Sequence, residues 1–153
     1  MGRKVRRAIK GSRVEVGEER VVAVSKKEGS NVQFVKMSVD GDKMFVGGSI
    51  DACYEYSLSN KEERVINKFD FWSILVTQGF VYIGGFKEVC VYDVSLGRFT
   101  KSIKTKDFVY CIFQLDSDHF LCGSCKGHLE IINSKYQEVL SESKISGTVF
   151  DIC

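Results

Sequence analysis

The sequence is poor in several features that would point to particular classes of protein. Its 153 residues contain no proline, one tryptophan and two histidines. No apolar run approaches the roughly 18 residues that a membrane-spanning helix needs, so we expect no membrane span. No apolar block follows the basic N-terminus as in a secretion signal, and Arg6 and Arg7 stand where a myristoylated chain carries Ser or Thr. The sequence therefore predicts an intracellular protein, cytoplasmic or nuclear.

Residue patterns that carry out catalysis are scarce as well. The sequence has no nucleophile elbow, phosphate-binding loop or acidic metal cluster, and the glycine pairs at 47–48 and 84–85 lie between expected strands instead of opening helices. The acidic stretch 116–118 falls in a turn, where Asp side chains typically bond to nearby backbone. We therefore expect neither enzyme activity nor a cofactor.

What the chain does have is a glycine mark at regular intervals. The strings MFVGGS, VYIGGF and FLCGSC begin at Met44, Val81 and Phe120. Gly47 and Gly84 are about 37 residues apart, and Gly84 and Gly123 about 39. A fixed period near 40 residues, with strand-like sequence between the marks, indicates a repeat architecture.

Each repeat reads as four strands separated by short polar turns. Alternation is clearest in EVCVYDV, where Val89 and Val91 face one side and Cys90 the other. A glycine inside such a strand marks a bend or a close backbone approach. Two short strands precede the three units and an apolar stretch follows them, giving fifteen expected strands. Outside the glycine strands, the expected ranges are 13–16, 20–24, 32–39, 53–58, 63–69, 71–76, 88–94, 97–104, 108–115, 128–133, 137–143 and 147–153.

The repeats resemble the WD-repeat family of β-propellers. The segment CGSCKGHLEIIN (122–133) fits the family's strand signature without a gap, with Ile132 and Asn133 in place of Trp-Asp. Tyr92-Asp93 and Tyr56-Ser57 are the corresponding pairs of the other two units. No unit has the Gly-His dipeptide of the family, so its side-chain hydrogen-bond network is not carried over. A propeller outside the strict family remains an alternative.

The resemblance implies an all-β fold, a partial β-propeller of roughly 3.5–4 four-stranded antiparallel blades spanning 14–153. Propellers close with about 4–8 blades. The chain is therefore either part of a larger propeller or a small ring in which the C-terminal strand joins the N-terminal pair. An open arc would leave unpaired strand edges and favour self-association.

Positive charge is concentrated at the N-terminus. The first 13 residues carry six basic side chains and no acidic one, while the remainder has 16 basic and 20 acidic residues, a net charge of −4. We treat 1–13 as a basic arm that could contact nucleic acid, an anionic membrane surface or an import receptor, or simply be solvated. It lacks the aromatic residues that read RNA bases. The basic residues are Arg3, Lys4, Arg6, Arg7, Lys10 and Arg13.

Four metal-ligating residue types follow one another at intervals of three in the last unit. They resemble a zinc set, but Cys122 aligns with core positions, and His119 would lie roughly 10 Å from it at strand rise. We therefore expect no metal site and, in a reducing compartment, unbridged thiols that pack as small hydrophobes. The four residues are His119, Cys122, Cys125 and His128.

The resemblance implies a protein–protein interaction scaffold with other proteins as partners. Its binding face would combine the fourth-to-first-strand connections with the second-to-third-strand turns, where aromatic side chains on a rigid scaffold make good anchors. Trp72 and Tyr110 could instead be core residues. The alternative function is a nucleic-acid-associated assembly subunit that uses the basic arm. The candidate partner-binding residues are Asp51, Asp70, Phe71, Trp72, Lys87, Asp107, Phe108, Tyr110, Lys126, Ser146 and Thr148.

Overall fold

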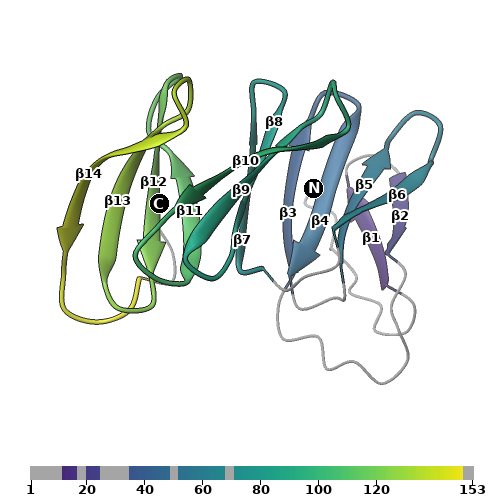
Figure 1. The fold of residues 1–153 in the computed structure, drawn as a ribbon. Coiled ribbons are helices and arrows are strands. Elements are labelled where there is room, and N and C mark those ends of the chain that lie inside the picture. The colour runs from purple at the N-terminus through teal and green to yellow at the C-terminus, as the bar shows by residue number, and fades with distance from the viewer. Residues whose placement is uncertain (1–11, 17–19, 25–34, 49–51, 68–70, 150–153) are drawn as a thin grey trace. The chain divides into compact units, whose positions relative to one another are not determined.

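Every regular element in the described part of the chain is a β-strand. The computed structural model describes residues 12–16, 20–24, 35–48, 52–67 and 71–149, and the fourteen strands found there confirm the all-β prediction (Figure 1). The described part has no helix that is long and apolar enough to cross a bilayer. The chain divides into two compact units, Met1–Phe69 and Asp70–Cys153, called here the N-terminal and C-terminal units.

The N-terminal unit contains a hairpin and a four-stranded antiparallel sheet. Arg13, which the sequence placed in the basic arm, lies within the first strand and pairs with Ala23, so the arm is shorter than expected. Residues 1–11 of that arm lie outside the described residues. The hairpin is β1 (Ser12–Val16) and β2 (Arg20–Val24), and the sheet runs in the order β3 (Val35–Asp40), β4 (Lys43–Gly48), β5 (Cys53–Ser57), β6 (Glu63–Asn67).

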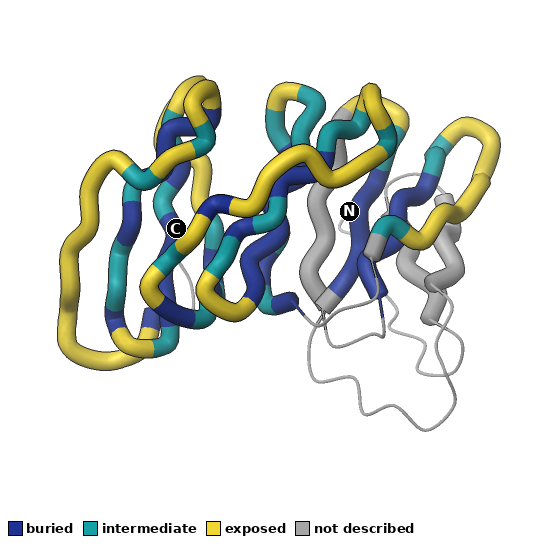
Figure 2. The backbone as a smooth tube through the Cα atoms, viewed as in Figure 1, coloured by how far each residue is buried: buried dark blue, intermediate teal, exposed yellow. Residues whose placement is uncertain are grey.

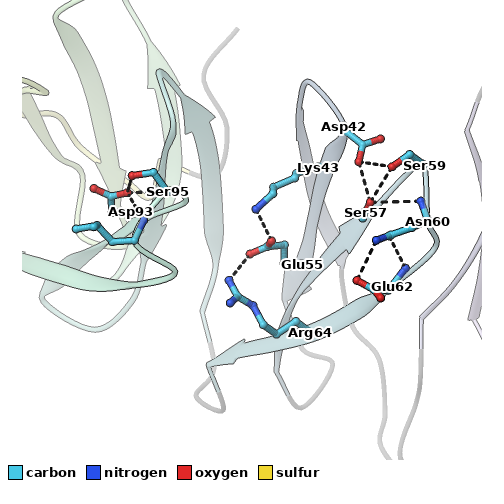
Figure 3. A network of polar contacts seen from close by, with 11 residues as sticks. Asp42, Lys43, Glu55, Ser57, Ser59, Asn60, Glu62, Arg64, Asp93 and Ser95 are labelled. Carbon is cyan, nitrogen blue, oxygen red and sulfur yellow. Dashed lines mark hydrogen bonds and ion pairs between the residues drawn. The ribbon is translucent and has the colours of Figure 1, made fainter.

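A buried carboxylate ties three strands of this sheet together (Figure 3). Glu55 on β5 accepts Lys43 Nζ of β4 at 2.7 Å and the Arg64 guanidinium of β6 at 2.8 Å. Burial alone would raise the pKa of Glu55, but the hydrogen bonds from both cations outweigh it and hold that pKa below its usual value. Glu55 therefore stays ionised as a strut between neighbouring strands.

The C-terminal unit consists of two four-stranded antiparallel sheets (Figure 1). In each sheet the strands neighbour one another in chain order, as the four-strand repeat predicts. β7 contacts β11, so the first strands of the two sheets lie side by side. The strands are β7 (Ser73–Thr77), β8 (Phe80–Gly84), β9 (Glu88–Asp93), β10 (Arg98–Lys104), β11 (Val109–Gln114), β12 (His119–Ser124), β13 (His128–Asn133) and β14 (Glu138–Lys144).

The core of this unit lies between its two sheets. Figure 2 shows the middle strands largely buried, whereas β10 and β14 are mainly exposed. Facing side chains alternate along each strand, as period 2 requires. The buried set from the first sheet is Tyr82, Val89, Val91 and Ile103, and that from the second is Val109, Phe120, Cys122 and Ile132.

The repeated glycines allow the sheets to approach one another. A Cβ on Gly84 would lie 2.9 Å from Val109 Cβ, and one on Gly123 would lie 2.8 Å from Val149 Cβ. Val109 N–H donates to the Gly85 carbonyl at 3.0 Å, and Val149 N–H donates to the Ser124 carbonyl at the same distance. The period near 40 in the sequence thus records one backbone approach, made twice.

Asp93 and Asn133, in the place of the family's final Asp or Asn, close the hairpins that follow β9 and β13. Asp93 Oδ1 accepts the N–H groups of Ser95 and Leu96, and Asn133 Oδ1 accepts that of Tyr136, all within 2.9 Å (Figure 3 shows Asp93 and Ser95). Side chains that accept from the next turn are typical of Asx turns. The strand expected at 147–153 is not present over 147–149, and 150–153 lie outside the described residues.

Candidate interaction face

The antiparallel order brings several connections to one end of the C-terminal unit. These are 85–87, 105–108 and 125–127, together with the beginnings of β7 and β11. Backbone bonds join them: Trp72 N–H donates to the Gly84 carbonyl at 2.9 Å, and Cys125 N–H to the Phe108 carbonyl at 3.2 Å. We call this the aromatic end; the opposite end carries the connections 78–79, 94–97, 115–118 and 134–137.

Four aromatic side chains form a continuous row at the aromatic end. Trp72 meets Tyr110 edge-on with ring centroids 4.9 Å apart, and Tyr110 stacks beside Phe108 at 6.4 Å. Phe108 contacts Phe86 at 4.5 Å. Trp72, Tyr110 and Phe108 are half-buried, whereas Phe86 is 58% exposed. This aromatic row presents apolar area to solvent on sheets that are otherwise well packed.

A lysine lies over the exposed end of the row. Lys87 Nζ is 5.3 Å from the Phe86 ring centroid, within the range of a cation–π interaction. Both residues belong to the tight turn between β8 and β9, which Gly85 N–H closes on the Glu88 carbonyl at 3.0 Å. Lys87 adopts a left-handed backbone with φ 57°, uncommon for a residue with a side chain.

An ion pair holds Phe108 in place. Asp107 accepts Lys126 Nζ at 3.0 Å and the backbone N–H of Phe108 at 2.8 Å, and its side chain is almost fully buried. These hydrogen bonds, Lys126 first, lower the pKa of Asp107 to about 2. The partly buried Cys125 thiol beside it has a raised pKa, because burial and the hydrogen bond to Asp107 both disfavour the thiolate.

The structure gathers some of the residues expected at a binding face and not others. Trp72, Phe108 and Tyr110 come together, so the expectation that they share one face is met by their ring contacts. Phe71 is fully buried and cannot present its ring to a partner there, which corrects its assignment. Lys87, Lys126, Ser146 and Thr148 are exposed, while Asp107 is buried; Asp51 and Asp70 lie outside the described residues.

Phe86 is the residue that the sequence interpretation missed. It stands directly after Gly84-Gly85 in VYIGGF, in the turn where only Lys87 was singled out. Its signal was available: an aromatic residue in a tight polar turn between two strands has no sheet face on which to be buried. Gly127 at the corresponding turn of the next sheet has φ +75° and lies against the Ile145 carbonyl, so that turn leaves no room for a side chain at Gly127.

The zinc-like residues serve other purposes. His119 Nδ1 lies 2.9 Å from Asp116, and its Nε2 lies 3.4 Å from the Asn133 amide nitrogen. Cys122 is buried in the core, where burial raises its pKa well above the usual value. No group of three or more His, Cys, Asp or Glu side chains placed to hold a metal ion occurs among residues 12–149 that the structure describes.

The fold defines the chain as an all-β protein of repeated four-stranded antiparallel sheets. No protein-family model matches the sequence, and no curated protein matches it either. Among solved structures, a chain of hydrazine synthase from Kuenenia stuttgartiensis is similar, with a TM-score of 0.64 and 18% identity over 80% of this chain. The match spans 38% of that chain's length. At this identity the likeness concerns the fold alone.

Proposed function

We propose that the protein is a non-catalytic protein–protein interaction scaffold and that the aromatic row is its binding face. The observation that carries the proposal is the row itself, four contacting rings on turns and strand beginnings with Phe86 58% exposed. Binding energy in protein interfaces concentrates in a few aromatic anchors set on a rigid frame. The two packed sheets supply that frame.

The finer architecture that we propose is a WD-like partial β-propeller of roughly 3.5–4 blades. Supporting it, Val149 meets Gly123 and Ser124 as Val109 meets Gly84 and Gly85. Val149 therefore marks where a further four-stranded sheet would pack. The face of β11–β14 turned away from β7–β10 carries Phe113, 37% exposed, and the half-buried Leu129 and Ile131, which such a sheet would cover.

Association in solution tests this architecture. If another copy supplies the covering sheet, sedimentation should show a mass that rises with concentration, and Ile131→Asp should lower it. A monomer with labels at residues 14 and 150 close together would support the small ring. A monomer with distant labels whose stability Ile131→Asp leaves unchanged would overturn the proposal of a covered face.

Chemical groups beside the row favour binding over catalysis. Asp107 is occupied by Lys126 and the Phe108 amide, and the raised pKa of Cys125 disfavours the nucleophilic thiolate. Burial also raises the pKa of Cys53 to about 12 and that of Cys90 to about 11. Thiols of this kind suit the reducing intracellular setting that we propose for the protein.

Site-specific photo-crosslinking tests the scaffold proposal. A crosslinking phenylalanine analogue at position 86 should capture one defined protein in cells, and the same analogue at position 136 should not. Position 136 is a matched control, because Tyr136 is 60% exposed and also has a lysine over its ring, at 5.5 Å. The purified partner should then bind wild type and lose affinity for Phe86→Ala. Equal capture at both positions would contradict the proposal.

The basic N-terminus supports a second proposal, a nucleic-acid-associated assembly subunit. Six positive charges without an acid in 13 residues contrast with the net −4 of the remainder. Binding through phosphates releases counterions, so affinity for a DNA or RNA duplex should fall steeply with salt and disappear when residues 1–11 are deleted. Salt-insensitive binding, or binding that survives the deletion, would reject this role for the arm.

A further inference from the structure

We propose that the aromatic row recognises acidic segments of partner proteins, in which an apolar side chain is flanked by Asp or Glu. This inference rests on the proposed scaffold function and names the chemistry of its partner. Two observations combine to support it: the charge of the connections that frame the row, and the position of Lys87 over Phe86.

The two ends of the C-terminal unit carry opposite charge. The connections of the aromatic end hold Lys87, Lys106 and Lys126 against Asp107, a net charge of 3 − 1 = +2. Those of the opposite end hold Lys135 against two aspartates, at 116 and 118, a net charge of 1 − 2 = −1. Complementary charge steers encounter and selects partners, so the aromatic end favours an acidic one.

Among these cations, Lys87 is the one placed to meet a partner carboxylate. Lys126 is paired with the buried Asp107 at 3.0 Å, and Lys106 lies 3.3 Å from Glu142. Lys87 forms no ion pair with a described residue, and its ammonium group lies above the Phe86 ring. An ammonium group has three donors, so a carboxylate can bind it while an apolar neighbour packs beside Phe86 and Phe108.

The ring geometry favours a peptide over a nucleic acid. Bases stack on open, flat aromatic faces along a basic groove. Here neighbouring rings meet at 61° and 43°, and Lys87 lies over the most exposed ring. Such tilted rings offer edges and small pockets to a branched or aromatic side chain, and one unpaired lysine suits a carboxylate better than a run of phosphates.

A direct binding assay on the full chain tests the inference. The probe is a fluorescein-labelled 12-residue peptide that alternates Leu and Phe with Asp and Glu, followed by fluorescence anisotropy. Trp72 is the only tryptophan of the chain, so its emission reports whether the peptide occupies the row. We expect saturable binding with a shift in Trp72 emission. A peptide with Asn and Gln in place of Asp and Glu should bind about tenfold more weakly, about 1.4 kcal/mol.

Matched variants locate the charge contact. Lys87→Glu should weaken the acidic peptide about tenfold or more, and Lys87→Gln less, because the first introduces repulsion and the second only removes attraction. Lys135→Glu is the control, since Lys135 lies over an exposed ring at the opposite end. It should change affinity less than twofold. Thermal melts of the three variants should match wild type, because both lysines are exposed.

Four outcomes would overturn the inference. They are equal binding of the amide peptide, tighter binding of a Lys/Arg version, tighter binding of a 12-nucleotide oligo-dT, and equal loss of affinity with Lys135→Glu. A partner captured at position 86 that ignores the acidic peptide would disprove the acidic specificity and leave the scaffold function standing. Failure of that capture at position 86 would reject the scaffold function itself.

Discussion

The two sheets of the C-terminal unit carry the same pattern but experience different surroundings. Cross-strand register makes Tyr82 and Val91 of the first sheet equivalent to Leu121 and Ile131 of the second. Tyr82 and Val91 are at most 1% exposed, because β11–β14 covers them. Leu121 and Ile131 are only half-buried. Equivalent positions are thus apolar in both sheets, although only one sheet has that face covered in the described part.

This difference shows that the repeat specifies a sheet with two apolar faces. An antiparallel sheet with one face in water alternates apolar and polar residues, so a second apolar face indicates a second packing partner. Ser143, the equivalent of Ile103 by register, is the polar exception at the outer strand. Edge strands are therefore where the second sheet departs most from the first.

The largest effect should come from truncating a phenylalanine on the covered face of β11–β14. Phe120 is 1% exposed, and Phe120→Ala should cost roughly 3–5 kcal/mol of unfolding free energy in urea titrations. Phe113, 37% exposed on the other face, is its matched control and should cost about 1 kcal/mol. Equal costs would mean that something in solution covers Phe113 as well.

Strand positions were largely predictable because alternation and glycine spacing are local signals. The expected strand 88–94 matches β9, and 128–133 matches β13. Whether a face is covered depends on the neighbouring sheet, which no local pattern records. Phe71 and Phe86 illustrate this, since similar aromatic residues next to turns are buried in one case and 58% exposed in the other.

The candidate site was less predictable than the fold because it depends on local irregularities. The register shifts between Val109 and Cys111, so Tyr110 occupies a bulge at the start of β11. Such an extra residue re-aims its side chain. The bulge brings the Tyr110 ring between Trp72 and Phe108, and neither hydrophobicity nor spacing indicates that arrangement.

A smaller effect is expected where the two sheets approach at the glycine marks. A Cβ at position 84 would lie 2.7 Å from Val109 Cγ1, so Gly84→Ala should destabilise the protein by about 1–3 kcal/mol through overpacking. Gly85→Ala is the neighbouring control, with no atom within 4 Å of the added Cβ, and should change stability by less than about 0.5 kcal/mol. Similar melting of both variants would contradict the close approach.

Acid should weaken the aromatic end through Asp107. Its pKa is lowered to about 2 in the folded chain from an ordinary 3.8, so its stabilisation is present above about pH 4 and is lost as pH falls toward 2. Asp107→Asn should flatten the stability curve in that window, measured by urea unfolding from pH 2 to 6. Asp118→Asn at the opposite end is the control. Identical curves for wild type and Asp107→Asn would show that the pair with Lys126 does not form.

The smallest effect on stability should come from Phe86, although it is central to the proposed binding face. Most of its ring is in water, so Phe86→Ala removes mainly the contact with Phe108 and should cost about 0.5–1 kcal/mol. Tyr136→Ala, similarly exposed at the opposite end, should cost less than about 0.5 kcal/mol. Chemical denaturation measures both. A loss above about 2 kcal/mol for Phe86→Ala would show that the ring holds the fold, and the row would then be an extension of the core instead of a surface kept for a partner.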